Sequence, residues 1–493
     1  MIIVIIIILI INRIDMAQDI DFANRLYYDY ENFKEKTINQ RRFKHSDLLP
    51  IIGRMKNNTL FKVKKAGESA EGRDIFLISA GSGDQKIFLW SQMHGDEPTA
   101  TMAMFDIFNF FCDESRFSEF KKKLLENATV YFMPMINPDG AEIYQRRNSF
   151  NIDLNRDAVR QQMPEARILR ETFDSLKAEF GFNLHDQSTR YSAGNTFKSA
   201  TLSFLAPAID GNKTIDTVRE KAMKLTAELY KILSSFIPGH IAKYSDDFEP
   251  RAFGDNFQRW GTSTILIESG GWKDDPEKQF IRKLNFIALL CAFKSISEKN
   301  YSGESIETYE SIPNNEEWLM DLLIRNLTFK IKGREFLIDL GINREEVNVN
   351  GGKNFYYSSY VEDAGDLSVF FGYEDYDFAG MEVSLGRTYE KVFNSLSEIE
   401  KINFKELYRE GFTAVQMKSA NPDSGGSLPE YSALPINIIL NNKPSPRENI
   451  EIEGPADFVI SKEGIVKSII INGFLYNIEN STGEIKNGLI FKQ

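Results

Sequence analysis

The stretch from Lys86 to Cys112 limits the folds open to this chain, because it predicts a buried strand, a sharp turn and a helix in direct succession. An apolar run, Lys86–Ser91, precedes the turn, and apolar residues recur at helical spacing from Pro98 to Cys112. Pro98 suits the first helical position, where its missing N–H group costs nothing. The turn carries His94 and Glu97, an imidazole and a carboxylate that could hold the same metal ion.

The alternation of strands and helices continues to about residue 300 and predicts an α/β sandwich. In such folds ligands bind beyond the carboxyl ends of the strands. His94, His185 and Glu268 each lie at or just after such an end, which predicts a functional site at one edge of the sheet. The further strands are predicted at 128–134, 182–186, 201–205 and 263–269, and the helices at 163–180, 214–236 and 276–297.

A metal site needs a ligand beyond the turn, because a catalytic zinc ion usually takes three protein ligands and leaves a fourth position open. Of the four histidines in the chain, His185 follows an apolar run, whereas His45 and His240 lie in polar contexts. His185 is therefore the candidate third ligand. Taken alone, the His94–Glu97 pair fits chance placement as well as a metal site, and His185 also suits a satisfied core histidine.

Glu268 is a candidate general base. It follows the apolar residues Thr264–Ile267, so we expect it at the end of a buried strand, where desolvation raises the pKa of a carboxyl group. Facing a metal-bound water, it could take up a proton and pass it to a leaving amine. Without a metal nearby, the same carboxylate would only cap the next segment.

Two basic motifs lie in a stretch with few signals of regular structure. Arg146-Arg-Asn148 precedes Asp153, and Asn155-Arg156 follows it. Two arginines aimed into a pocket could polarise a carbonyl group and grip a carboxylate. Solvated arginines in a loop are an equally good explanation of the composition.

These motifs occur in an order that resembles a known family. The resemblance is to the zinc carboxypeptidases of the carboxypeptidase A type (family M14), and it covers about residues 50–300. It implies a mixed-sheet α/β/α sandwich that holds one zinc ion per chain. The motifs that carry it are His94-x-x-Glu97, Asn137-Pro-Asp-Gly140, Arg146-x-Asn148, Asp153-Leu-Asn-Arg156, His185 and Glu268.

The resemblance also implies an activity, the hydrolysis of a C-terminal peptide bond by metal-activated water. The substrate would be a peptide or an amino-acid amide. The implied roles are zinc binding for His94, Glu97 and His185, general-base catalysis for Glu268, oxyanion stabilisation for Arg146, and binding of the substrate's terminal carboxylate for Asn155 and Arg156.

The chain departs from the family in two places, and one of them is Asp186-Gln-Ser188 after His185, which differs from the sequence of the digestive enzymes. The family has a substrate-binding tyrosine about twenty residues before the base; Tyr244 is the candidate, in an unfamiliar setting. Specificity residues should lie between 252 and 262, where Asp255 and Arg259 could each favour a substrate side chain of opposite charge.

Two alternatives to a carboxypeptidase stay open. One is a zinc amidohydrolase that removes the acyl group from N-acyl amino acids, of the aspartoacylase or succinylglutamate desuccinylase type. The other is a non-catalytic relative that binds peptides. The presence of all three ligands and the base argues against the second alternative.

A chain of 493 residues is too long for one ordinary core and predicts two or three domains. We expect a catalytic domain over 49–300, after an N-terminal helical segment over 17–48. Residues 310–493 would form an accessory region, with short strands and helices up to about 430 and a β-rich part over 430–493. Residues 1–16 would be either an apolar leader or a mis-assigned start.

The formal net charge of -12 argues against a general nucleic-acid binder and against stable association with an anionic membrane. The isoleucine run of residues 1–11 is too short to cross a bilayer as a helix. It lacks a preceding basic residue and a following cleavage signal, which favours translation from Met16 and a cytoplasmic protein. Export would follow if residues 1–15 were a genuine signal segment.

Overall fold

The structure, a computed structural model, describes residues 2–418, 434–440, 449–479 and 486–492. The chain divides into two compact units. The first comprises Met1–Glu317 with Asn350–Lys353, and the second Trp318–Val349 with Asn354–Gln493. Among the described residues, no helix has both the length and the apolar character that crossing a membrane would require.

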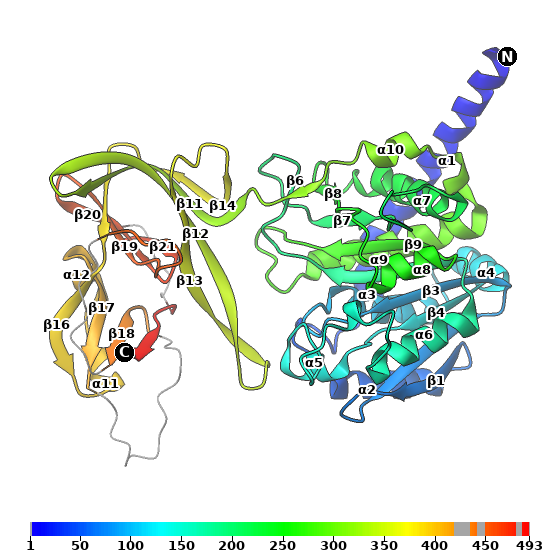
Figure 1. Ribbon diagram of the computed structural model, residues 1–493, viewed down its shortest axis with the longest axis horizontal. Coiled ribbons are helices and arrows are strands. Elements are labelled where there is room, and N and C mark those ends of the chain that lie inside the picture. The colour runs from blue at the N-terminus through cyan, green and yellow to red at the C-terminus, as the bar shows by residue number, and fades with distance from the viewer. Residues whose placement is uncertain (1, 419–433, 441–448, 480–485, 493) are drawn as a thin grey trace. The chain divides into compact units, whose positions relative to one another are not determined.

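The first unit is built on an eight-stranded mixed sheet in the order β1-β2-β4-β3-β5-β9-β7-β8 (Figure 1). Its four central strands, β4, β3, β5 and β9, run parallel, and the strands next to them on either side, β2 and β7, run antiparallel to them. The predicted mixed-sheet α/β fold is therefore confirmed. The strands are β1 (Phe61–Glu68), β2 (Asp74–Gly81), β3 (Gln85–Ser91), β4 (Ala128–Met133), β5 (Phe180–Asp186), β7 (Leu202–Leu205), β8 (Ile241–Lys243) and β9 (Ser263–Ser269).

Helices cover both faces of this sheet, and the alternation of side chains along the central strands explains why. In β3, Ile87 and Leu89 belong to the larger hydrophobic cluster with α3, α7 and α9, whereas Phe88 and Trp90 pack with α6 and α8 on the other face. The helices are α1 (Ile2–Asp29), α2 (His45–Lys56), α3 (Thr99–Cys112), α4 (Ser118–Asn127), α5 (Pro138–Ile143), α6 (Pro164–Leu176), α7 (Thr217–Leu233), α8 (Phe253–Arg259), α9 (Gln279–Glu298) and α10 (Ile306–Glu310).

Helix α6 is shorter than the predicted helix over 163–180. It ends at Leu176 because Lys177 adopts a left-handed backbone conformation with φ 47°. The chain then enters β5 at Phe180, so residues assigned to the end of a helix in fact begin a strand. The short helix α8 carried no periodic signal of its own.

The N-terminal segment is fastened to the first unit by a buried ion pair. Arg282 on α9 pairs with Asp106 on α3, and both side chains are fully buried. The same guanidinium donates hydrogen bonds to the backbone oxygens of Glu35 (3.0 Å) and Ile38 (2.7 Å). Residues 35–38, which precede α2, are therefore an integral part of this unit.

The second unit is dominated by long antiparallel strands, which differs from the short strands and helices expected up to about residue 430. Strands β11 (Leu319–Ile331), β12 (Arg334–Val349) and β13 (Asn354–Gly365) have 13, 16 and 12 residues. The pattern misled because β12 begins with four exposed residues, Arg334–Leu337, and so lacks the alternation of a half-buried strand. These strands continue into a sheet in the order β13-β12-β11-β15-β19-β20-β21.

The remaining elements of the second unit complete that sheet and add another. Strand β14 pairs with β11, and a four-stranded parallel sheet has the order β16-β17-β18-β22. Their bounds are β14 (Phe371–Asp377), β15 (Glu382–Leu385), β16 (Arg387–Phe393), α11 (Leu396–Ile399), α12 (Phe404–Arg409), β17 (Phe412–Met417), β18 (Asn437–Leu440), β19 (Phe458–Lys462), β20 (Ile465–Ile471), β21 (Phe474–Asn477) and β22 (Ile490–Lys492).

Candidate metal centre and active site

The site lies where the parallel strands of the first unit end. Strands β3, β5 and β9 point the same way, so Ser91, Asp186 and Ser269 meet at one edge of the sheet. The register pairs His185 directly with Glu268. The sheet therefore gathers the three strand ends that the sequence singled out.

The turn that carries His94 is packed against the Asn137–Gly140 turn. A Cβ atom on Gly95 would lie 2.1 Å from the backbone carbon of Gly140, so only glycine fits there. The Asn137 amide donates to the backbone oxygens of Met93 (3.2 Å) and Arg146 (3.3 Å) and accepts from the Gly140 N–H group (2.9 Å). Asn137 thus fixes the entry to the turn.

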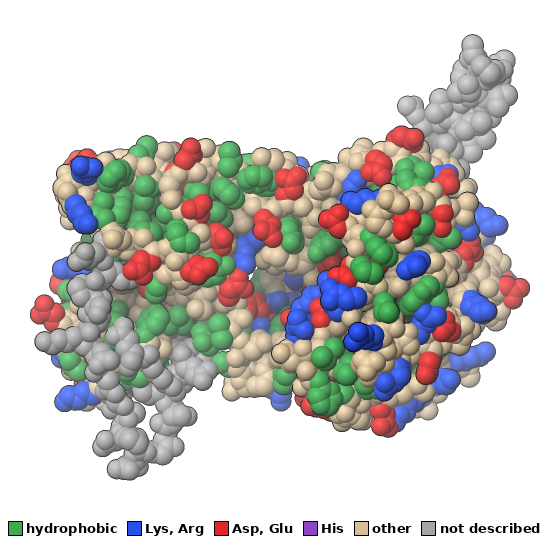
Figure 2. Space-filling model, viewed as in Figure 1, with side chains coloured by type: hydrophobic (Ala, Val, Ile, Leu, Met, Phe, Trp, Pro, Cys, Tyr) green, Lys and Arg blue, Asp and Glu red, His purple; other side chains and the backbone are tan. Residues whose placement is uncertain are grey.

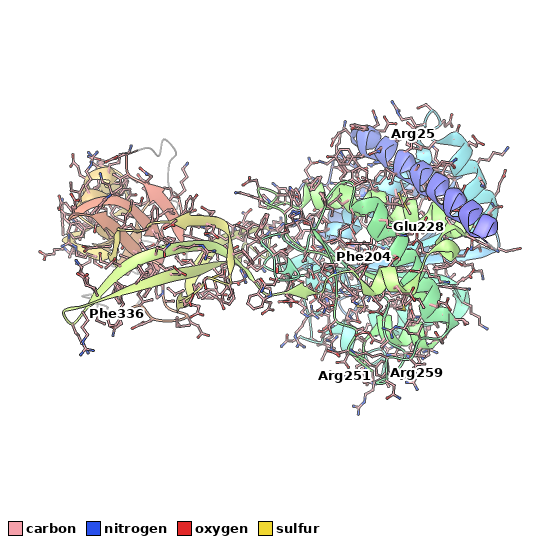
Figure 3. The ribbon with its side chains drawn as sticks, turned by 90° about the horizontal axis from the view of Figure 1, so that it is seen from above. Arg25, Phe204, Glu228, Arg251, Arg259 and Phe336 are labelled. Atoms are coloured by element: carbon pink, nitrogen blue, oxygen red, sulfur yellow. The ribbon has the colours of Figure 1, made fainter. Side chains whose placement is uncertain are left out.

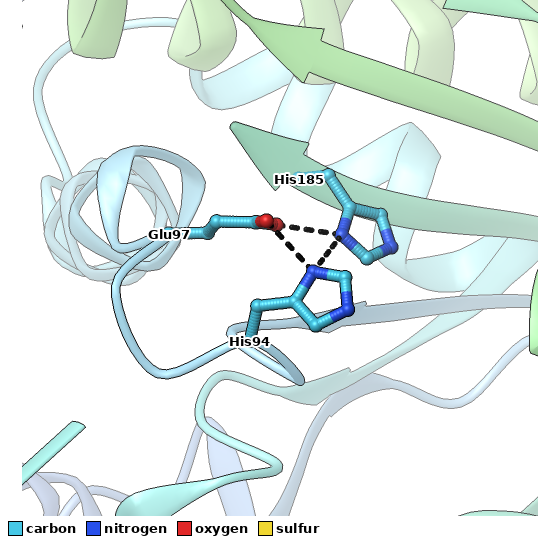
Figure 4. Close-up of side chains that lie close together, drawn as sticks. All are labelled: His94, Glu97 and His185. Carbon is cyan, nitrogen blue, oxygen red and sulfur yellow. Dashed lines mark hydrogen bonds and ion pairs between the residues drawn. The ribbon is translucent and has the colours of Figure 1, made fainter. Parts of the chain in front are cut away.

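His94, Glu97 and His185 converge on one point (Figure 4). The Nδ1 atom of His94 lies 2.7 Å from Glu97 Oε1, and the Nδ1 atom of His185 lies 2.7 Å from Glu97 Oε2. The two Nδ1 atoms are 3.2 Å apart. All three residues are buried, with 2%, 7% and 2% of their surfaces exposed.

This donor set fits a zinc ion. Two imidazole nitrogens and one carboxylate are a ligand set of catalytic zinc sites, and their candidate ligand atoms lie within 4.8 Å of one another. The far nitrogen of His94, Nε2, lies 3.1 Å from Asp153 Oδ1, the kind of contact that orients a metal-binding imidazole. The far nitrogen of His185 has no hydrogen-bond partner among the described residues.

The three side chains place one carboxylate between two imidazoles in a buried environment. Burial would raise the pKa of Glu97, but His94 and His185 hold it far below its usual range. Burial lowers the pKa of His94, yet Glu97 and Asp153 outweigh burial and raise it to about 9. Burial keeps the pKa of His185 below its ordinary value. At neutral pH the proton on His94 balances the Glu97 carboxylate, and a bound cation would displace that proton.

Glu268 lies beside this cluster, and one of its carboxylate oxygens is available for a hydrogen bond. Its Oε2 atom is buried and has no hydrogen-bond partner among the described residues. Burial and the nearby charge of Glu97 raise the pKa of Glu268 well above its usual value. A raised pKa makes the Glu268 carboxylate a stronger base.

Arg146 reaches the cluster from the loop after α5. Its Nη1 atom lies 3.2 Å from Glu97 Oε1, and its Nε and Nη2 atoms lie 3.2 and 3.1 Å from Asp153 Oδ2. The side chain is 44% exposed, so the guanidinium is anchored on one side and open to solvent on the other. This geometry suits a group that meets a substrate.

Asn155 and Arg156 are held apart from the metal ligands. The Asn155 side chain is buried and accepts a hydrogen bond from the Phe253 N–H group (2.9 Å), which ties it to the start of α8. Arg156 is exposed, and its Nε atom lies 3.3 Å from Glu249 Oε2. The two residues therefore lie at the rim of the site rather than in the cluster.

Tyr244 lies within electrostatic reach of the candidate base. It follows β8, where its N–H group donates to the Phe204 carbonyl oxygen (2.9 Å). Burial and the nearby Glu268 raise the pKa of the Tyr244 hydroxyl to about 12. The hydroxyl therefore stays protonated and can donate a hydrogen bond.

The two specificity candidates on α8 differ sharply. Asp255 is buried, and burial raises the pKa of its carboxyl group to about 6. Arg259 is exposed, and Figure 3 shows its side chain at the outer margin of the first unit. The structure therefore leaves Asp255, and not Arg259, in an interior position.

Sequence reasoning missed the contacts behind the metal ligands. Asp186 Oδ2 accepts a hydrogen bond from Thr99 Oγ1 (2.6 Å) and pairs with the Lys278 ammonium group (3.2 Å). Thr99 follows Glu97 by two residues, a spacing that could have drawn attention to it. Lys278 carries no motif that would have revealed its position.

Known proteins similar to this chain are carboxypeptidases. A family described as zinc carboxypeptidase matches residues 54–230, a range that contains His94, Glu97 and His185 but ends before Glu268. Carboxypeptidase SOL1 of Arabidopsis thaliana is 38% identical over 104 residues, which cover 20% of this chain and 21% of that protein. Probable carboxypeptidase 2 of Trichophyton verrucosum is 26% identical over 174 residues, 33% of this chain and 32% of that protein. The chain thus matches at most about a third of the length of these relatives.

Solved structures are similar over about half of the chain. The metallo-carboxypeptidase from Burkholderia cenocepacia has a TM-score of 0.42 and 15% identity, and covers 52% of this chain and 70% of its own. The carboxypeptidase A from Helicoverpa armigera has a TM-score of 0.43 and 12% identity, and covers 58% and 81%.

Proposed function

Since residues 54–230 belong to the zinc carboxypeptidase family, we propose that this chain is a zinc-dependent hydrolase that cleaves the C-terminal peptide bond of its substrate. The observation that carries the proposal is the convergence of His94, Glu97 and His185 beside the unpaired oxygen of Glu268. A carboxylate next to three metal ligands is the arrangement that hydrolysis by an activated water requires.

His94, Glu97 and His185 would hold the zinc ion, and Asp153 would keep the His94 ring oriented through its Nε2 atom. When bound, the ion supplies Lewis-acid activation of water and of the substrate carbonyl. The N–H group of Asp186 donates to Glu97 Oε2 (3.2 Å), which helps to fix the carboxylate.

Glu268 would be the general base and then the general acid. Its raised pKa allows the carboxylate to accept a proton from the attacking water and to donate it to the amine that leaves. The unpaired Oε2 atom is the one available for this transfer.

The basic and phenolic groups around the cluster would position the substrate. The open side of Arg146 would stabilise the negative charge that develops on the carbonyl oxygen. Arg156, with Asn155, would bind the terminal carboxylate after exchanging its contact with Glu249. Tyr244 would donate a hydrogen bond to the substrate.

The test is zinc analysis of the full chain together with hydrolysis of a peptide panel that varies the C-terminal side chain. We expect stoichiometric zinc and chelator-sensitive release of the terminal residue. Hydrolysis of N-acyl amino acids in place of peptides would favour a deacylase. Bound zinc without any hydrolysis would favour a non-catalytic binding protein.

Replacing Glu268 by Gln tests its role as the general base. We expect zinc to be retained and kcat to fall by roughly a hundredfold or more, because proton transfer is lost. Glu228→Gln is the matched control, since Glu228 is a second buried glutamate, on α7, whose pKa burial raises to about 8. Retained hydrolysis in the Glu268 variant would refute the assignment of the base.

A further inference from the structure

We propose that Lys278 is a positioning residue that fixes the positions of the metal ligands and the general base relative to one another. Its ammonium group donates to Asp186 Oδ2 (3.2 Å) and to the backbone oxygen of Ser269 (2.9 Å). Asp186 follows His185 in the chain, and Ser269 follows Glu268. One cation thus joins the ends of the two strands that carry a ligand and the base. The inference rests on the proposed function.

The third segment of the site is bound to the same point. Thr99 Oγ1 donates to Asp186 Oδ2 (2.6 Å), and Thr99 lies two residues after Glu97 at the start of α3. The N–H group of Asp186 donates in turn to Glu97 Oε2 (3.2 Å). Through its contact with Asp186, Lys278 is therefore linked to the segment that carries Glu97 as well as to the strand that carries His185.

The pair is built into the interior. The side chains of Lys278 and Asp186 are 7% and 6% exposed, so neither charge is hydrated enough to be stable alone. An ion pair with such low exposure is not screened like one at the surface. Its two ends must stay together, and with them the strand ends.

The backbone of Lys278 shows that this position is not an ordinary helix cap. Lys278 precedes α9 with φ 50°, a left-handed conformation that is uncommon for a residue with a side chain. Asp275 caps the helix instead, accepting from the N–H groups of Gln279 (2.7 Å) and Phe280 (2.9 Å). A lysine ammonium group cannot accept from helix N–H groups, and that of Lys278 donates to Asp186. Strained backbone persists where its surroundings fix it.

A lysine within α9, the helix that Lys278 directly precedes, offers a comparison. Lys294 pairs with Asp19 on α1 (2.7 Å), and its side chain is 17% exposed. Neither partner contacts a segment that carries a metal ligand. Lys294–Asp19 is thus a largely buried lysine–aspartate pair on that helix with a purely structural setting.

The test replaces each pair by neutral residues of similar size in the full-length zinc-loaded chain. The variants are Lys278→Met with Asp186→Asn, and, as the matched control, Lys294→Met with Asp19→Asn. Both leave the net charge unchanged, so a change in cation affinity cannot come from an added or removed charge. The measurements are the zinc Kd by competition with a chelator, kcat and KM on the best peptide of the panel, and the visible spectrum of the cobalt-substituted protein.

For the Lys278–Asp186 variant we expect zinc binding about tenfold weaker and kcat about ten- to a hundredfold lower, as when partners behind metal ligands are removed. KM should stay within about twofold, and the cobalt spectrum should change because the ligand geometry changes. The control should leave Kd, kcat and spectrum as in the wild type.

Lys278→Arg keeps the charge and should retain most of the zinc affinity. If the double variant fails to fold, Lys278→Met alone decides, because loss of a positive charge by itself would tighten cation binding. Zinc affinity and spectrum unchanged in a folded variant would overturn the positioning role. A wild type that binds no zinc would overturn the proposed function and this inference with it.

Discussion

Two clusters of buried charge in the first unit differ in whether their polar atoms have hydrogen-bond partners. Around Arg282 and Asp106, both carboxylate oxygens accept hydrogen bonds, and every guanidinium nitrogen donates to an oxygen. At the strand ends, His185 Nε2, Glu268 Oε2 and Asp186 Oδ1 have no partner among the described residues.

An unpaired buried polar atom costs about 1–3 kcal/mol, so a chain retains such atoms where something else supplies the partner. The satisfied cluster holds the N-terminal segment in place. Under the proposed function, a zinc ion, a water and the substrate would supply partners for the unsatisfied cluster. Surface charge alone does not separate the two regions, because Figure 2 shows acidic, basic and hydrophobic side chains interspersed over the first unit.

The largest effect should come from removing a ligand of the unsatisfied cluster. His185→Ala should abolish stoichiometric zinc binding and, with it, hydrolysis, because two ligands remain. His240→Ala is the control, since His240 lies outside the cluster and bonds to Ser199. Metal analysis by mass spectrometry with a peptide assay measures both quantities. Full zinc occupancy in His185→Ala would mean that the ligand set is wrong.

Breaking the satisfied cluster should act on folding instead. Arg282→Met leaves Asp106 buried without its cation and should lower the free energy of unfolding by about 3–5 kcal/mol. Urea denaturation measures the loss. Zinc affinity of the folded fraction should match the wild type. A large change in zinc Kd would show that the two clusters are coupled and would break the contrast between them.

Within the site, removing the open arginine should have an intermediate effect. Arg146→Met should lower kcat about a hundredfold, since a single donor to a developing oxyanion is worth about 2.7–4 kcal/mol. Its neighbour Arg147 is exposed and donates to the Asn151 backbone oxygen, so Arg147→Met is the matched control and should retain full activity. Equal losses in both variants would point to a general effect of loop charge.

The contrast also explains what the sequence could predict. His94 and Glu97 share one turn, and His185 and Glu268 end apolar runs, so local patterns revealed all four. The Asp153 contact with His94 spans 59 residues and the Lys278 contact with Asp186 spans 92, and no local pattern links such pairs. Tertiary packing, which brings Asp153 to His94 and the residue before α9 to the end of β5, creates these contacts.

The second unit was predicted less well for a related reason. Strand β12 has four exposed residues at its start, Arg334–Leu337. Buried and exposed positions therefore do not alternate there as they do in a half-buried strand. Its partners β11 and β13 are its neighbours in the chain, and the two hairpins start from the pairs Ile331–Arg334 and Val349–Asn354. Long strands of this kind follow from pairing and not from local periodicity.

The smallest expected effect is the loss of a single hydrogen bond from the satisfied cluster around Arg282 and Asp106. Tyr30 donates to Asp106 Oδ2 (2.9 Å) from a position that is 1% exposed, so Tyr30→Phe removes one hydrogen bond from the satisfied cluster and changes no charge. We expect a loss of about 1 kcal/mol in the free energy of unfolding, because Asp106 keeps its other three donors. Tyr230→Phe on the partly buried surface of α7 should cost less. Urea denaturation of both variants gives the difference, and zinc affinity should stay at the wild-type value. A loss in Tyr30→Phe as large as that in Arg282→Met would mean that the cluster fails as a unit once any donor is removed, and its stability would then rest on cooperativity and not on the ion pair.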